Sequence, residues 1–125
     1  RYTWRYRKPI SVDVWHELGR ELVGKRDFSS FRKTGSKRLN PVCDLLACSS
    51  RRDGDTVTVA VTADAFLRGM VRAIIGTFVR VAPDSSADIA TATASLREIL
   101  AARDRSVAGA SAPAQGLCLV RVAYP

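Results

Sequence analysis

The segment from Asp64 to Val79 constrains the fold more than any other part of this chain. On a helix of 3.6 residues per turn its apolar residues form one broad stripe over about four turns, a pattern that a strand of period two cannot accommodate. The segment therefore predicts a helix that begins at Asp64 and forms the centre of the core. The stripe consists of Phe66, Leu67, Met70, Val71, Ile74, Ile75, Phe78 and Val79.

Helices and strands are also expected on both sides of this segment. Apolar residues follow Ser11 at helical spacing, so the sequence predicts a helix over 12–23 with Ser11 as its N-cap and Gly24 at its end. The pattern is strand-like over 41–52 and alternating over 56–62, and the Asp53-Gly54 pair between them is a strong hairpin turn.

The last third of the chain has weaker signals. The Ala/Ser/Thr/Asp segment 83–95 is interpreted as a connecting loop that runs into a short helix around Leu96, Ile99 and Leu100. A final strand is expected over 117–122. Antiparallel strands with helices packed on one face predict the α+β class rather than a parallel doubly wound sheet.

Composition limits the class of protein. With 125 residues, 46% of them hydrophobic and 26% charged, the chain is typical of one globular domain over 1–125. A domain of this size buries about two-thirds of its unfolded surface and needs no disulfide or metal to fold. The chain starts at Arg1 without a methionine, within an aromatic and basic run, which suggests a piece of a longer protein.

The charge is strongly positive and uneven. Lys and Arg number 20 against 12 Asp and Glu, a net charge of +8, and residues 1–38 alone carry eleven basic and four acidic residues. Such a distribution favours a polyanionic partner, with nucleic acid as the first hypothesis. The alternative is that the excess charge only keeps the protein in solution.

Several classes of chemistry lack their residues. His16, expected on the outer side of its helix, is the single histidine, and the three cysteines have no C-x-x-C spacing, so neither a zinc site nor a nucleophile–histidine pair is indicated. No phosphate-binding glycine loop, membrane span or signal peptide is recognisable. The odd number of cysteines best fits a reducing cytoplasm.

The polar side of the segment 64–79 carries an unusual ridge. Arg68, Arg72, Gly76 and Arg80 follow one another at intervals of four, with Gly69 and Ala73 beside them. The small residues allow a second backbone or a ligand to approach closely, and an arginine among them could be functional. The alternative is a second packing interface with arginines that are solvated or paired to carboxylates.

A second candidate region combines aromatics, hydroxyls and cations over 26–38. Its phenylalanines could stack on bases while its cations hold phosphates, or Phe28 and Phe31 could be core residues beside a solvated basic loop. The core interpretation is favoured for the phenylalanines and phosphate binding for the loop cations, which are Arg32, Lys33, Lys37 and Arg38.

Short blocks across almost the whole chain resemble, in order, the C-terminal half of the tRNA pseudouridine synthase A (TruA) family. The series ends at that family's G-L-x-L-x-x-V-x-Y-P close, which makes it specific although each block is weak alone. The blocks are Leu22-Val23-Gly24, Asp27-Phe28-Ser29-Ser30-Phe31-Arg32, Ala65-Phe66-Leu67, Met70-Val71-Arg72, Ile75-Gly76, Asp104-Arg105, Ala112-Pro113-Ala114, Gly116-Leu117 and Val122-Ala123-Tyr124-Pro125.

The resemblance implies an enzyme that isomerises uridine to pseudouridine in the anticodon stem-loop of tRNA. It implies no metal or organic cofactor, a cytoplasmic location, no membrane and a homodimer. The family uses an aspartate in a G-R-T-D motif of its N-terminal domain, a tyrosine near the domain junction and an arginine that matches Arg72. No aspartate here follows Gly-Arg-Thr. We therefore expect a C-terminal domain that supplies the arginine and part of the RNA cleft and is inactive alone.

The resemblance also assigns substrate contacts. Phe28, Ser29, Gly116 and Leu117 are expected to wall the uridine pocket, with Arg68 as a further contact. Arg32, Lys33, Lys37 and Arg38 are expected to hold tRNA phosphates, and Arg72 to pair with the catalytic aspartate while Gly69, Ala73 and Gly76 let the N-terminal domain approach. The alternative function is a non-catalytic RNA-binding or dimerisation module.

Overall fold

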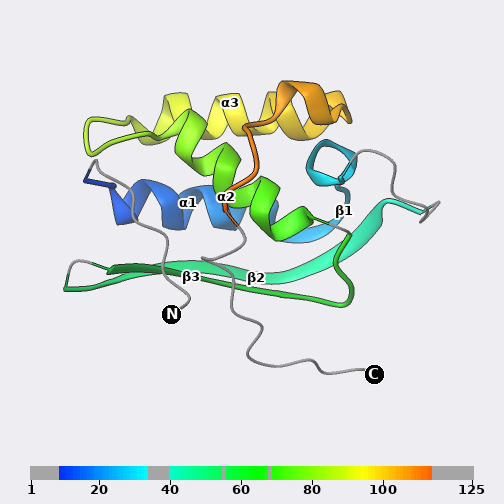
Figure 1. The fold of residues 1–125 in the computed structure, drawn as a ribbon, viewed down its shortest axis with the longest axis horizontal. Helices are drawn as coiled ribbons and strands as arrows, with labels where there is room; N and C mark the ends of the chain where they lie inside the picture. Colours follow the sequence, from blue (N-terminus) through cyan, green and yellow to red (C-terminus); the bar gives the residue numbers. More distant parts are fainter. Residues whose placement is uncertain (1–8, 34–39, 55, 68, 114–125) are drawn as a thin grey trace.

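A computed structural model describes residues 9–33, 40–54, 56–67 and 69–113. Within this part of the chain, three helices and two short 3-10 turns accompany a sheet of three antiparallel strands in the order β1-β2-β3, which confirms the predicted α+β class (Figure 1). The elements are α1 (Val12–Leu22), β1 (Gly24–Asp27), η1 (Ser29–Phe31), β2 (Val42–Asp53), β3 (Thr56–Ala63), α2 (Met70–Val81), α3 (Ile89–Ala102) and η2 (Arg105–Val107).

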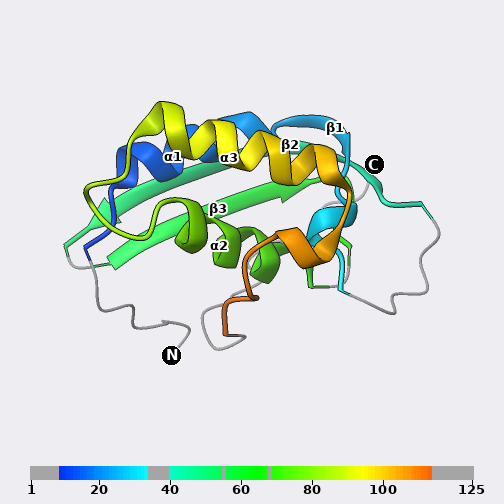
Figure 2. The same cartoon turned by 90° about the horizontal axis from the view of Figure 1, so that it is seen from above.

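All three helices lie on the same face of the sheet (Figures 1 and 2). The core fills the space between the two layers, because each element directs its apolar residues there. Its fully buried members come from the three helices, from η1 and the residue before it, and from β2: Leu18 and Leu22 of α1, Phe28, Phe31 of η1, Leu45 of β2, Ile74 and Phe78 of α2, and Leu96 of α3. No helix among the described residues is both long and apolar enough to cross a membrane.

The first helix forms as predicted and is tied to the end of α2. The Ser11 hydroxyl caps α1 by accepting a hydrogen bond from the Val14 amide at 3.4 Å. The buried Trp15 indole N–H donates to the Ala82 carbonyl at 3.1 Å, and its ring meets Phe78 edge to face. The hydrogen bond to Ala82 satisfies the one polar atom of this buried ring, as burial requires.

The predicted hairpin is confirmed, and a third strand accompanies it. Gly54 makes the turn with a φ of 61°. The pairing of β2 with β3 begins beside this turn, where Asp53 lies opposite Thr56. The strand β1 was not predicted, because four residues with two exposed cations carry no alternating pattern. It pairs with β2 from Gly24 opposite Leu45 to Asp27 opposite Val42.

The second helix begins later than the apolar pattern predicts. It starts at Met70 rather than Asp64, since Asp64 extends the sheet instead: its amide donates to the Asp44 carbonyl at 3.0 Å and its carboxylate accepts from the Asp44 amide at 2.8 Å. Gly69 then has a φ of 73°, a left-handed conformation that interrupts a helix.

The third helix is longer than the sequence indicates. It begins at Ile89, because the Asp88 carboxylate accepts from both the amide and the hydroxyl of Thr91 at 2.9 Å. The expected connector 83–95 is therefore a loop only as far as Asp88. The predicted strand 117–122 lies outside the described residues.

Candidate functional site

The guanidinium of Arg72 is held in a fixed orientation at the surface of α2. The side chain is half-buried, and its Nε donates to the Ala112 carbonyl at 2.7 Å. The Ala112 amide donates in return to the Arg72 carbonyl at 2.9 Å. Among the described residues neither Nη nitrogen has a partner. The backbone of residue 112 thus determines the direction in which Arg72 presents its two Nη nitrogens.

The segment 107–112, which we call the crossing segment, runs over α2 (orange in Figure 1). Gly76 and Ala110 meet so closely that a Cβ atom on Gly76 would collide with the Ala110 carbonyl. The Thr77 hydroxyl accepts from the Gly109 amide at 3.1 Å and donates to the Ala73 carbonyl at 2.7 Å. The glycines therefore permit a backbone-to-backbone contact that a larger residue would exclude.

This contact corrects one expectation. Gly76 does not receive another domain, since the crossing segment of the same chain covers it. Ala73 is likewise buried, with 1% of its surface exposed. For these two residues the packing interpretation of the small-residue ridge is correct.

The arginines of the ridge have partners of a kind the sequence did not indicate. Arg80 donates through Nη1 to the carbonyls of Ala108 at 3.2 Å and Val107 at 3.3 Å. Arg72 and Arg80 therefore both donate to backbone carbonyls of the crossing segment, a partner that neither interpretation of the ridge named, although Arg80 is also exposed to solvent. Arg68, the third arginine of the ridge, lies outside the described residues.

The start of α2 lies beside the basic region that follows η1. A Cβ atom added to Gly69 would lie 3.2 Å from the Cβ of Lys33, so the two backbones are close neighbours. Gly69 precedes Arg72 by one helical turn, and a helix N-terminus carries partial positive charge. Lys33, the helix terminus and Arg72 thus contribute positive potential to one end of α2. Lys37 and Arg38 lie outside the described residues.

The two phenylalanines of the candidate region 26–38 are core residues. Phe28 and Phe31 are both fully buried, with ring centroids 6.2 Å apart. The expected role of Phe28 in contacting substrate is not supported, because its ring has no exposed face on which a base could stack. Ser29 is half-buried, and its hydroxyl and amide both donate to the Asp27 carboxylate at 2.5 and 2.8 Å.

A polar cluster fixes η1 to the last part of the described chain. The buried Ser30 hydroxyl donates to the Ile99 carbonyl at 2.6 Å and accepts from the Asp104 amide at 2.9 Å. Burial raises the pKa of the Asp27 carboxyl, but the Ser29 hydrogen bonds and the nearby Arg103 outweigh it, so the net pKa lies below its ordinary value. The cluster holds η1 against the end of α3 and the start of η2.

Two residues of this arrangement were missed from the sequence. Thr77 was not singled out, and Arg105 was noted only as part of a matching block. Arg105 donates to the Gly109 carbonyl and to the Ser111 hydroxyl, both at 2.9 Å. A hydroxyl on the buried face of an apolar helix was the one available signal for Thr77, because such a group needs a partner.

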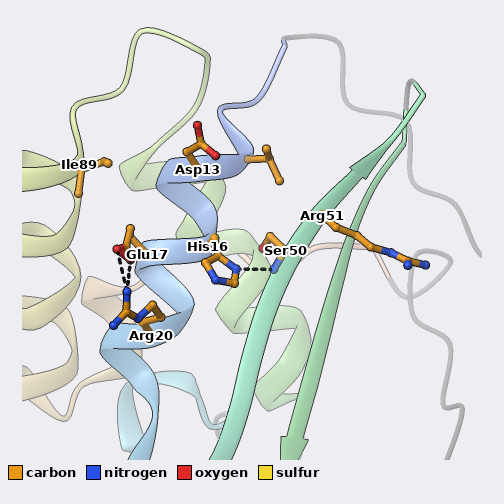
Figure 3. Close-up of a pocket in the computed structure, with 8 residues that line it drawn as sticks. Asp13, His16, Glu17, Arg20, Ser50, Arg51 and Ile89 are labelled. Carbon is orange, nitrogen blue, oxygen red and sulfur yellow. Dashed lines mark hydrogen bonds and ion pairs between the residues drawn. The ribbon is translucent and has the colours of Figure 1, made fainter.

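A surface hollow lies elsewhere and contains none of the expected site residues (Figure 3). His16 accepts a hydrogen bond from the Ser50 amide at 3.3 Å, and Glu17 forms an ion pair with Arg20 at 3.3 Å. Two of its four charged side chains therefore pair with each other. Across the described residues, no three His, Cys, Asp or Glu side chains are grouped so that they could hold a metal ion. The hollow is lined by Val12, Asp13, His16, Glu17, Arg20, Ser50, Arg51 and Ile89.

Comparison with known proteins identifies relatives along nearly the whole chain. A sequence profile described as tRNA pseudouridine synthase matches residues 19–125. A protein named tRNA pseudouridine synthase A from Acidiphilium cryptum (strain JF-5) is 37% identical over 123 residues, which cover 98% of this chain and 46% of that protein. Proteins of the same name from Xanthomonas oryzae pv. oryzae (strain PXO99A) and Tolumonas auensis (strain DSM 9187 / NBRC 110442 / TA 4) are 40% and 38% identical over 95% and 96% of this chain. The chain spans 44% of each of these two relatives.

Proposed function

Since this chain belongs to the tRNA pseudouridine synthase family, we propose that it is the C-terminal domain of an enzyme that isomerises uridine to pseudouridine in the anticodon stem-loop of tRNA. The observation that carries the proposal is the family match over residues 19–125. The chain covers less than half of each relative named above. We therefore assign the nucleophilic aspartate and the junction tyrosine to an N-terminal domain that completes the site.

The reaction requires the C1′–N1 glycosidic bond to break, the uracil to rotate and a C1′–C5 bond to form, after which C5 loses its proton. An aspartate can take part as nucleophile only while it is ionised and correctly placed, and the target base must leave the stack. In the proposed enzyme the two Nη nitrogens of Arg72 pair with that carboxylate. Such a charge-assisted fork lowers the pKa of the aspartate and sets its orientation.

The surrounding residues have separate roles in the proposal. Arg32 and Lys33 hold tRNA phosphates together with Lys37 and Arg38, and their net positive charge draws the RNA toward the start of α2. Ser29 and Phe28 support the pocket wall from behind, since the Phe28 ring is buried. Gly116 and Leu117 complete the wall in accordance with the family resemblance, and Arg68 is a further substrate contact in the proposal.

We also propose that the enzyme works in the cytoplasm as a homodimer, as the family resemblance implies. Two buried cysteines, Cys43 and Cys48, form no disulfide among the described residues, which agrees with a reducing compartment. Burial raises the pKa of the Cys48 thiol to about 12, so this cysteine stays protonated and unreactive. The thiols are therefore core residues and take no part in the chemistry.

The test is tritium release from unmodified tRNA labelled at C5 of uracil. It compares the 125-residue chain with the full-length protein, and tRNA binding is measured on both. We expect release from the full-length protein alone and tRNA binding by both. Binding without release in either would favour the non-catalytic module, whereas release by the 125-residue chain would show that it contains the nucleophile.

A further inference from the structure

We propose that Arg105 is a positioning residue that orients the Arg72 guanidinium by holding the crossing segment in place. The inference rests on the proposed function, in which Arg72 acts on the aspartate of the reaction centre. It adds a residue outside α2 whose effect on the reaction passes through the backbone of residues 109–112. Arg105 itself touches neither the substrate nor the aspartate in this proposal.

Arg105 bonds the two chain neighbours of Ala110, the residue that lies over α2. Its Nη1 donates to the Gly109 carbonyl and its Nη2 to the Ser111 hydroxyl, each at 2.9 Å. Ala110 is the residue whose carbonyl faces Gly76. The guanidinium of Arg105 therefore fixes the part of the crossing segment that must remain in contact with the helix.

The remaining side-chain contacts hold the other end of the segment. Arg80 bonds the carbonyls of Val107 and Ala108, and Thr77 bonds the Gly109 amide. Beyond Gly109, the described side-chain contacts to the segment come from Arg105 and from Arg72 itself. Without Arg105, Ala112 would be held by its main-chain hydrogen bond to the Arg72 carbonyl and by the Arg72 side chain that it orients.

The direction of the guanidinium depends on that carbonyl. Because Nε is already bonded to Ala112, only Nη1 and Nη2 remain for a carboxylate, and these two nitrogens form a planar end-on fork. If Ala112 moves, the fork rotates with it. A misplacement of about 1 Å at a reacting group can lower a rate by about 100-fold.

Arg105 is not a free cation for RNA. The residue is half-buried, and both of its Nη nitrogens are already bonded to the crossing segment. Its replacement should therefore lower the rate of the chemical step and leave tRNA affinity almost unchanged. This distinguishes positioning from phosphate binding.

The experiment uses the full-length protein and measures three quantities for each variant: the single-turnover rate, the tRNA dissociation constant, and solvent exchange of the Arg72 Nε–H proton by NMR. The Arg72 resonance is identified as the one that disappears in Arg72→Lys. For Arg105→Ala we expect a rate lowered about 10- to 100-fold, affinity within threefold and faster Nε–H exchange. Arg105→Lys should recover part of the rate and part of the protection of Nε–H from exchange, because one ammonium can still bond one of the two acceptors.

Two further variants keep the test informative. Arg97→Ala is the matched control, since Arg97 is an exposed arginine that pairs with Glu21 and does not contact the crossing segment. Ser111→Ala removes only one of the two Arg105 hydrogen bonds, so it should fold even if Arg105→Ala does not. We expect wild-type behaviour from the control and a smaller effect in the same direction from Ser111→Ala.

Three outcomes would overturn the proposal. They are a wild-type rate in Arg105→Ala, a lowered rate with unchanged Arg72 Nε–H exchange, and equal losses of rate and tRNA affinity. An inactive wild-type protein would instead refute the proposed function. In that case the NMR measurement still decides whether Arg105 orients Arg72.

Discussion

The Cα atom of Gly76 lies directly against the carbonyl oxygen of Ala110, with no space between them for a side chain. In an open helix, replacing Gly by Ala stabilises the fold by about 1 kcal/mol. At this position the sign should reverse, because the new methyl group must push the crossing segment away from α2.

We expect Gly76→Ala to lower the free energy of unfolding by about 1–3 kcal/mol, the usual cost of overpacking. Urea denaturation of the variant and the wild type measures the difference. The control is Gly54→Asn, since Gly54 has no atom near its missing side chain and asparagine tolerates its left-handed turn. A Gly76→Ala protein as stable as the wild type would contradict the close contact.

Replacement of Arg72 should stop the reaction without preventing tRNA binding. Arg72→Ala removes the fork proposed to hold the aspartate, and Arg72→Lys keeps the charge but has no planar fork of two nitrogens to present while it bonds Ala112. In the full-length enzyme we expect turnover to fall at least about 100-fold in both variants, with tRNA affinity within a few-fold. Normal turnover in Arg72→Ala would refute the catalytic role.

The basic region after η1 should control the salt dependence of tRNA binding. Changing Lys33, Lys37 and Arg38 to glutamine removes three cations proposed to hold phosphates, and each cation removed should reduce the slope of log K against log salt by about 1. Filter binding from low to high salt measures the slope. Arg20→Gln is the control, because Arg20 is an exposed arginine paired with Glu17. An unchanged slope would remove the three residues from the interface.

Asp27 should make the fold sensitive to acid. Its folded-state pKa lies below the ordinary value near 4, so its carboxylate stabilises the fold above that value and the contribution disappears as the pH falls through the folded-state pKa. We expect Asp27→Asn to be less stable at neutral pH and to lose stability less steeply below about pH 4. Urea midpoints from pH 7 to pH 2 measure this. Asp88→Asn should change neutral stability little, since asparagine also caps helices.

The sequence predicts the long helices and the hairpin better than the start of α2 or the presence of the short strand β1. Strong periodicity located α1, the hairpin and most of α2, because burial of one face requires those patterns. The start of α2 was misplaced since Asp64 resembles a helix cap but bonds the backbone of Asp44 across the sheet. The strand β1 was missed because its pairing with β2, rather than its own residues, makes it a strand.

At the candidate site, too, the sequence indicates individual residues but not the long-range contacts that they make. Arg72 could be identified from spacing and resemblance, but its bond to Ala112 joins residues 40 positions apart, and no local pattern encodes such a contact. The same holds for Arg80, for which solvent or a carboxylate was one of the two interpretations left open. Guanidinium groups donate both to backbone carbonyls and to carboxylates, so only the path of the backbone reveals the partner.

The Ser30 hydroxyl can form its hydrogen bonds only after most of this chain has been synthesised. Its two partners, Ile99 and Asp104, lie 69 and 74 residues further along the chain. The β2–β3 hairpin joins near neighbours and can form early, whereas closing a loop of about 70 residues is entropically costly and slows folding. On the ribosome, therefore, the hydrogen bonds that fix η1 to α3 and η2 cannot both form until residue 104 has left the exit tunnel.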